Sequence, residues 1–113
     1  MIFTESIRDN LRFRYLYNHG KSTHDDSLVL FVKKNNLSIN RLGICVSKKI
    51  GNSCARNRVT RVIKEIYRLN EKYFCRGFDM VFVAKKNIVN SDFYAIRDCI
   101  IRLSRKHNIF GAV

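Results

Sequence analysis

Lysines and arginines gather between residues 48 and 68 with the types and spacing that bind a phosphate backbone. From Arg41 to Arg68 the chain has eight basic side chains and one acidic side chain, Glu65. An arginine guanidinium is planar and makes paired hydrogen bonds to phosphate oxygens. A merely solvated helix face would mix both signs of charge and gain ion pairs between them. We therefore interpret this segment as a nucleic-acid contact, with a solvated helix face as the alternative.

The same segment has the periodicity of an amphipathic helix that follows Ser53 and runs to about Asn70. With Val59 set at zero and about 100° per residue, the apolar side chains lie within roughly 80° of it. These side chains are Val62, Ile63, Ile66 and Leu69. A polar and basic group lies roughly 140–200° away. Its members are Asn57, Arg61, Lys64 and Arg68. Arg58 lies at the border, so the pattern predicts one core face and one basic face.

The turn before this helix adds an anion site. Residues 51–53, Gly-Asn-Ser, predict a turn and a helix N-cap. The first backbone N–H groups, at the positive end of the helix dipole, would then face outward beside Lys48, Lys49 and Arg56. That arrangement suits an RNA phosphate. The Walker glycine-lysine pattern is missing, so a nucleoside-triphosphate loop is not indicated.

A first predicted helix, from about Ser6 to Asn18 and ended by Gly20, carries aromatic side chains among arginines. Phe13 and Tyr17 are four residues apart and share a face. The interleaved arginines are Arg8, Arg12 and Arg14. Aromatic rings beside arginines can stack on single-stranded bases. The alternative is that these rings pack in the core, as aromatic stripes on helices usually do.

Three predicted strands and a closing helix complete the chain. Leu28–Lys34 and Arg41–Ser47 alternate apolar residues on one face, and Asn35-Asn36 between them suits a turn, so we predict an antiparallel hairpin. Asp79–Lys85 predicts a third strand, and residues 91–106 predict a helix with one apolar stripe. The order helix, strand, strand, helix, strand, helix indicates an α+β or α/β two-layer sandwich, a mixed sheet packed with three main helices.

Composition places the chain among basic globular domains. We expect its 113 residues to form a single RNA-binding domain over 1–113, and 46% hydrophobic residues are too many for a disordered tail. The 22 Lys and Arg against 9 Asp and Glu give a net charge of +13. A polyanionic partner would relieve that repulsion. No apolar run is long enough to span a membrane and the first residues do not resemble a signal peptide, so we expect a cytoplasmic protein without a membrane partner.

The side chains that usually carry catalysis do not form a compelling group in the sequence. The four cysteines are scattered, form no C-x-x-C pair and do not cluster with the three histidines, so we predict no metal site. No paired carboxylates or activated nucleophile are evident. A self-sufficient nuclease using His19, His24 or the pair Asp25 and Asp26 remains one rival interpretation. A ribosomal or other structural RNA-binding protein is the second, and a DNA-binding helix is a weaker third.

The run Ser47-Lys48-Lys49-Ile50-Gly51-Asn52-Ser53-Cys54-Ala55-Arg56-Asn57-Arg58-Val59-Thr60-Arg61 resembles the signature of the bacterial ribonuclease P protein subunit. That signature has a lysine pair, a glycine, a short spacer and then an Arg-Asn-Arg run. Weaker similarities extend over most of the chain. They include the aromatic first helix ending in glycine, Phe31 on a strand, and the closing helix.

The resemblance implies a division of labour. The family's RNA subunit carries the chemistry with bound Mg²⁺, the protein contributes no catalytic residue, and the complex is an endoribonuclease that matures the 5′ end of tRNA. It implies that the basic helix and its preceding loop contact the catalytic RNA through Lys48, Lys49, Asn52, Arg56, Asn57, Arg58, Arg61, Lys64 and Arg68. It also implies that a cleft binds the single-stranded 5′ leader of precursor tRNA through Phe13, Tyr17 and Phe31.

The resemblance further implies a left-handed βαβ crossover around the basic helix, against the usual right-handed rule. It implies one protein monomer in a 1:1 complex with ribonuclease P RNA. One departure concerns Thr60, which stands where the family often has Lys or Arg, so this contact is in question. The chain also lacks the strongly basic N-terminal extension of some members.

Overall fold

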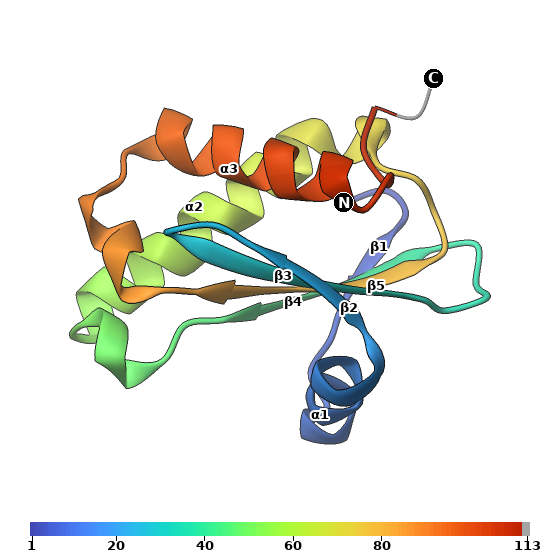
Figure 1. The fold of residues 1–113 in the computed structure, drawn as a ribbon, viewed down its shortest axis with the longest axis horizontal. Helices are drawn as coiled ribbons and strands as arrows, with labels where there is room; N and C mark the ends of the chain where they lie inside the picture. The colour runs from blue at the N-terminus through green and yellow to red at the C-terminus, as the bar shows by residue number, and fades with distance from the viewer. Residues whose placement is uncertain (112–113) are drawn as a thin grey trace.

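A computed structural model describes residues 1–111 of the chain as one layered α/β structure (Figure 1). The elements in order are β1 (Thr4–Ser6), α1 (Asn10–His19), β2 (Lys21–His24), β3 (Leu28–Lys34), β4 (Asn40–Cys45), α2 (Ser53–Asn70), β5 (Phe78–Ala84) and α3 (Phe93–Lys106). Short 3₁₀ helices, η1, η2 and η3, lie at Lys48–Ile50, Glu71–Tyr73 and Lys86–Asn90. No helix of the described chain is both long and apolar enough to cross a membrane.

The five strands form one mixed sheet in the order β1-β4-β5-β3-β2. β5 is parallel to β4 and antiparallel to β3, while β1 is parallel to β4. α2 and α3 cover one face of this sheet, and α1 lies alone against the other (Figure 1). The predicted class, a mixed sheet packed with three main helices, is confirmed.

The predicted hairpin between β3 and β4 is wrong. The turn itself is present, because Asn36 has a positive φ of 58°. The two strands are nevertheless separated by β5, which pairs with both of them. β5 is apolar on both faces, as a central strand buried between two layers must be. Alternation within a strand identifies its buried face but not its neighbour, so the sequence pattern could not exclude the hairpin.

The first helix begins later than predicted. Asp9 is its N-cap and accepts a hydrogen bond from the Leu11 N–H at 2.9 Å. Ser6, the predicted first residue, instead ends β1, which pairs in parallel with β4. The chain just before β1 is held by the buried Glu71 carboxylate, which accepts the N–H groups of Ile2 at 2.8 Å and Phe3 at 3.2 Å. The end of the helix at Gly20 is as predicted. Pairing of Ser6 with the distant β4, which local sequence does not reveal, thus delays the start of the helix until after the Asp9 cap.

The second missed strand is β2, Lys21–His24. Its sequence, Lys-Ser-Thr-His, has no apolar residue and therefore no alternation to detect. It pairs antiparallel with β3 at the edge of the sheet, from Lys21 opposite Val32 to His24 opposite Val29. Polar edge strands of this kind are common because they discourage pairing with other chains.

Two apolar cores hold the layers together. The larger lies between the sheet and the helices α2 and α3, and includes Met80, Phe82 and Ile63. The smaller lies under α1, where Leu16 packs with Ile7 and Val81. Successive side chains of β3 point alternately into the two cores, as predicted. The expected core stripe of α2 is confirmed except for Leu69, which is 51% exposed.

In place of Leu69, the last turn of α2 buries Tyr67. Its hydroxyl lies 2.8 Å from the Thr4 hydroxyl and accepts a hydrogen bond from the Asn40 side chain at 3.3 Å. Hydrogen bonds to β1 and β4 thus favour burial of Tyr67 instead of Leu69, which periodicity alone did not predict. α2 joins the parallel strands β4 and β5 in a βαβ unit. The left-handed sense of that unit stays a prediction.

Candidate nucleic-acid interface

The outer face of α2 carries an exposed basic surface. We define this basic surface as Lys48, Lys49, Asn52, Asn57, Arg58, Arg61, Lys64 and Arg68, all of which are exposed. The opposite face of the helix buries Val59, Ile63 and Ile66 completely or nearly so. Burial of these three side chains fixes the rotation of the helix, so the basic side chains lie on its solvent-exposed face. The structure therefore brings the predicted charged residues together on one side.

The turn before α2 is built as the sequence predicted. Gly51 has a φ of 153°, in the region that favours glycine. Asn52 is the N-cap, and its side-chain oxygen accepts the Ala55 N–H at 2.9 Å. The side-chain NH₂ of Asn52 has no partner within residues 1–111, so it can still donate to a bound oxygen. This turn leaves the first N–H groups of α2 beside the exposed lysines of η1.

Three side chains of α2 are partly engaged by the protein itself. Arg56 is half-buried, and its terminal nitrogen lies 3.4 Å from the Ser53 hydroxyl. Arg58 donates to the Ser91 carbonyl at 3.4 Å, which links α2 to the segment before α3. Thr60 donates to the Arg56 carbonyl at 3.0 Å. Thr60 lies in a shallow hollow of about 360 Å³ with Arg61 and Lys64, so a longer side chain there would extend the basic surface.

Within the part of the chain that the structure describes, Glu65 is the single acidic residue on this face. Glu65 forms an ion pair with Arg68, in which the Arg68 Nε donates at 3.1 Å. The hydrogen bond from Arg68 lowers the pKa of Glu65, so the pair stays ionised at neutral pH. Within residues 1–111, none of the other basic-surface cations has a salt bridge. Most of the positive charge is therefore uncompensated and available to a polyanion.

A second candidate site is a groove between α1 and β4. We define this α1 groove by Asn10, Phe13, Arg14, Tyr17, Ile44, Cys45 and Val46, which enclose about 470 Å³. Gly43 makes the groove possible. A Cβ at that position would lie 2.7 Å from the Phe13 ring, so only glycine lets the ring rest against the strand. The half-buried Phe13 thereby packs on the sheet and also lines the groove.

The three predicted aromatic residues are brought together beside this groove. The ring centroids of Tyr17 and Phe31 are 5.0 Å apart with an edge-on geometry, and those of Phe13 and Tyr17 are 6.4 Å apart. Tyr17 is 38% exposed, whereas Phe31 is half-buried. Partial burial and the neighbouring Cys45 thiol raise the pKa of Tyr17 to about 12, so its hydroxyl stays neutral. Aromatic rings held this way can stack on an unpaired base.

The groove and the basic surface are continuous along the chain. β4 supplies Ile44 and Cys45 to the groove, and Val46 follows. Lys48 comes two residues later, which spans at most about 7 Å of extended chain. The groove and the lysines of η1 therefore lie near each other.

A buried carboxylate, missed from the sequence, organises two of the expected cationic residues. Asp79 on β5 is fully buried and accepts hydrogen bonds from Arg12 Nε at 2.6 Å and Arg41 Nε at 2.7 Å. The Asn35 side chain donates a further bond at 3.0 Å. Burial alone would raise the pKa of Asp79, but the bonds from Arg41, Asn35 and Arg12 outweigh it and lower that pKa. Arg12 and Arg41 therefore fasten α1 and β4 to β5.

The residues of the rival nuclease interpretation do not form one site. His19 ends α1, where its ring stacks 4.5 Å from that of Tyr15. Asp25 is used by the turn into β3: its carboxylate accepts the N–H groups of Ser27 and Leu28, and pairs with Arg102 at 2.7 Å. Burial would raise the pKa of Asp25, but a hydrogen bond from the Cys99 thiol together with these bonds outweighs it and lowers that pKa to about 2. Over residues 1–111, no group of three or more His, Cys, Asp or Glu could hold a metal ion.

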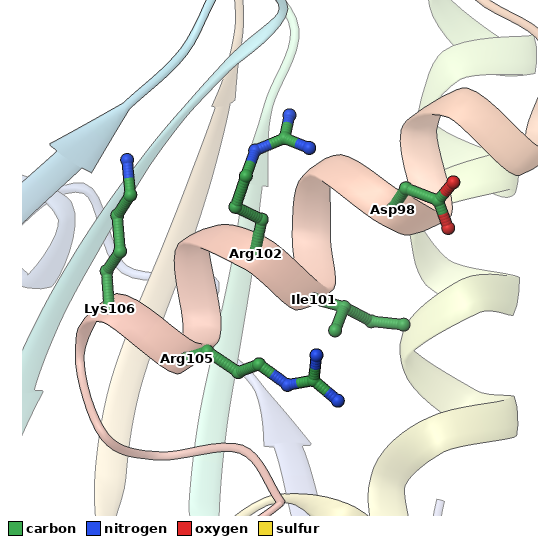
Figure 2. A pocket seen from close by; sticks show the side chains of 5 residues that line it. All are labelled: Asp98, Ile101, Arg102, Arg105 and Lys106. Atoms are coloured by element: carbon green, nitrogen blue, oxygen red, sulfur yellow. The ribbon is translucent and has the colours of Figure 1, made fainter.

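A further basic area lies on α3, where side chains surround a hollow of about 660 Å³ (Figure 2). The lining residues are Asp98, Ile101, Arg102, Arg105 and Lys106. Most of its charge is already engaged. Arg102 pairs with Asp25, and the Arg105 guanidinium lies 5.6 Å from the centre of the Phe110 ring. This area is therefore less suited to a polyanion than the basic surface of α2.

Comparison with known proteins gives one consistent family. The family model described as Ribonuclease P matches residues 2–108. The chain is 48% identical over 106 residues to a ribonuclease P protein component of Clostridium botulinum, covering 93% of this chain and 96% of the relative. The RNase P protein of Thermotoga maritima has a similar structure, with a TM-score of 0.83, 30% identity, and coverage of 90% of this chain and 96% of that one. The RNase P protein of Staphylococcus aureus gives 0.86 at 25% identity, with coverage of 93% and 96%.

Proposed function

Because the chain belongs to the family of bacterial ribonuclease P protein components, we propose that it binds two RNAs at once. The basic surface of α2 and η1 binds the catalytic RNA, and the α1 groove binds the 5′ leader of precursor tRNA. The observation that carries this proposal is the continuity of an exposed, largely unpaired cationic face with an aromatic groove. A protein with both features can join two RNAs that would otherwise repel each other.

Binding of the catalytic RNA rests on charge and geometry. Arg58, Arg61 and Lys64 face solvent on successive turns of α2, so they can follow a phosphate backbone. The capped start of α2, beside Lys48 and Lys49, adds backbone N–H donors for one more phosphate. A helix held by its apolar face presents these groups without rearrangement.

Binding of the leader rests on stacking in the α1 groove. Stacking of a base on an aromatic side chain contributes about 1–3 kcal/mol. A single such contact therefore raises affinity by about fivefold to 150-fold. Because mature tRNA lacks the leader, the groove would favour precursor over product. Phe13, Tyr17 and Phe31 are the residues proposed for this role.

The chemistry itself is assigned to the RNA. The described residues contain no acidic cluster fit to hold Mg²⁺, so any magnesium that directs the attacking water is proposed to be held mainly by the RNA subunit. The protein contributes binding, orientation and screening of charge. We further propose one protein monomer per catalytic RNA, acting in the cytoplasm.

Reconstitution tests the proposal directly. The purified protein is added to a bacterial ribonuclease P RNA at low Mg²⁺, and cleavage of precursor tRNA is followed with time. We expect cleavage at the mature 5′ end only when both components are present. No stimulation would favour a structural RNA-binding role, and cleavage by protein alone, abolished by His24→Ala, would favour the nuclease interpretation.

Phe13→Ala tests the groove separately. We expect it to weaken binding of precursor tRNA by about fivefold or more, since one base loses its stacking partner. Binding of mature tRNA should change little. Phe93→Ala is the matched control, because Phe93 is also half-buried on a helix but lies far from the groove in the chain and packs on the other core. Equal losses for both tRNAs, with the fold intact by circular dichroism, would make Phe13 a core residue only.

A further inference from the structure

A partly enclosed hollow lies at the end of the sheet where β2 begins and β3 ends. It has a volume of about 490 Å³, within the range of small-ligand sites. The end of α1, the start of β5 and the end of α3 also contribute to it. Its lining residues are His19, Lys21, Val32, Lys33, Lys34, Phe78, His107 and Asn108. None of these residues belongs to the basic surface or to the α1 groove.

Among residues 1–111, the side chains that line this hollow are cationic, neutral polar or apolar, and none is a carboxylate. Lys21, Lys33 and Lys34 come from adjacent ends of β2 and β3, since Lys21 is paired with Val32 across the two strands. None of the three lysines has a salt bridge within the part of the chain that the structure describes. Three like charges held together without an acid make the hollow attractive to an anion.

The wall contributed by α3 is held in a fixed position. The His107 ring lies with Nε2 3.2 Å from the Leu30 carbonyl oxygen. Since a carbonyl can only accept, Nε2 must be the donor, and this bond orients the imidazole against β3. The Asn108 N–H donates to the Arg105 carbonyl at 3.0 Å, and its φ of 58° ends the helix there. The hollow is therefore bounded by well-anchored structure where α3 ends.

An apolar floor and a nearby aromatic pair complete the site. Val32 is 6% exposed and Phe78 is half-buried, so both offer carbon surface inside the cationic rim. Outside the rim, the Tyr15 ring stacks on His19 at 4.5 Å between centroids, and the Lys33 ammonium lies 5.9 Å from the Tyr15 centroid. Carbon surface, imidazole and ammonium groups side by side match the parts of a nucleotide, whose base stacks and whose phosphate is charged.

We propose that this hollow is a further binding site for a nucleotide, with the phosphate on the lysines and the base against Phe78 or the Tyr15–His19 pair. The proposal goes beyond the two RNA contacts described above, because it uses a different end of the sheet and none of their residues. The nucleotide can come from two sources, a free mononucleotide or one unit of a single-stranded RNA.

Isotope-labelled protein titrated with AMP, and separately with a 5′-phosphorylated tetra-adenylate, tests the proposal without any ribozyme. We expect the His107 ring signals and the Lys33 amide signal to shift saturably with at least one probe. Saturation by AMP would assign the site to free nucleotides, and saturation by the tetranucleotide alone would assign it to RNA. This measurement needs only the wild-type protein, so its result does not depend on whether the protein acts in tRNA processing.

Matched double variants distinguish binding at this hollow from a general effect of net charge. Lys21→Ala with Lys33→Ala should weaken the affinity of the responding probe roughly tenfold, as the loss of two charged contacts implies. Arg8→Ala with Lys86→Ala removes the same charge from exposed residues that follow β1 and β5, at the other end of the sheet, and should weaken it less than twofold. Equal losses in the two double variants, or no shift at His107 with either probe, would overturn the proposal.

Discussion

The strongest quantitative expectation concerns Arg61 and Lys64, replaced together by alanine. Both side chains are exposed on the outer face of α2, and neither pairs with an acid within residues 1–111. Each phosphate contact contributes about 0.7–0.9 to the slope of log affinity against log salt concentration. Loss of two contacts should therefore make the slope shallower by about 1.4–1.8.

That change in slope has a direct consequence for affinity. Between 50 and 200 mM salt, the double variant should lose about tenfold less affinity for the catalytic RNA than the wild-type protein loses. Fluorescence polarisation with labelled ribonuclease P RNA, at fixed Mg²⁺ and several salt concentrations, measures both slopes. Circular dichroism should show an unchanged fold, because neither side chain contributes to a core.

Lys106→Ala is the control for net charge. Lys106 is exposed at the end of α3, a helix that carries no residue of the basic surface. We expect its slope to match that of the wild type. If the double variant keeps the wild-type slope, the outer face of α2 is not in the RNA interface, and the reasoning from its charge is refuted.

Three further substitutions test other parts of the structure. Asp79→Asn should lower the free energy of unfolding in urea by about 2–4 kcal/mol, because it leaves two guanidinium groups without their buried partner. The pKa of Asp79 in the folded protein lies below its ordinary value of 3.8. The ionised carboxylate should therefore stabilise the wild-type fold above about pH 4, and this stabilisation should be lost as the pH falls further. The Asp79→Asn variant should not show this pH-dependent loss. Gly43→Ala should displace the Phe13 ring, lower the free energy of unfolding by about 1–3 kcal/mol and weaken binding of the leader. An unchanged melting temperature would contradict the close contact between residue 43 and Phe13. Thr60→Lys should steepen the salt dependence by about 0.7–0.9, and no steepening would place residue 60 outside the interface.

The basic helix could be predicted from the sequence because its signal is local. Apolar residues at helical spacing identified the buried face of α2, and the charged residues between them had to face outward. The exception, Leu69, lies where Tyr67 takes the buried place by bonding to Thr4 and Asn40. Those partners are distant in the chain, so periodicity could not reveal them.

The sheet order could not be predicted for the same reason. Strand neighbours are chosen by contacts between distant segments, and β5 is buried on both faces without any local sign of which strands flank it. The role of Asp79 was also missed, although a lone acid inside an apolar strand was a signal that a cationic partner would be needed. Such a signal says that a partner exists but does not identify Arg12 or Arg41 as that partner.

The central position of β5 has a consequence for synthesis of the chain. β4 and β3 are complete by residue 45, yet neither pairs with the other, and both wait for a strand that is translated after α2. Native pairing must therefore close large loops late, which slows folding. A nascent or truncated chain that stops before Phe78 already carries every residue of the basic surface but has no finished sheet to display them. Such a fragment would meet cellular RNA as a disordered polycation, and ribosomes that stall in this interval should be expected to yield an indiscriminate RNA binder.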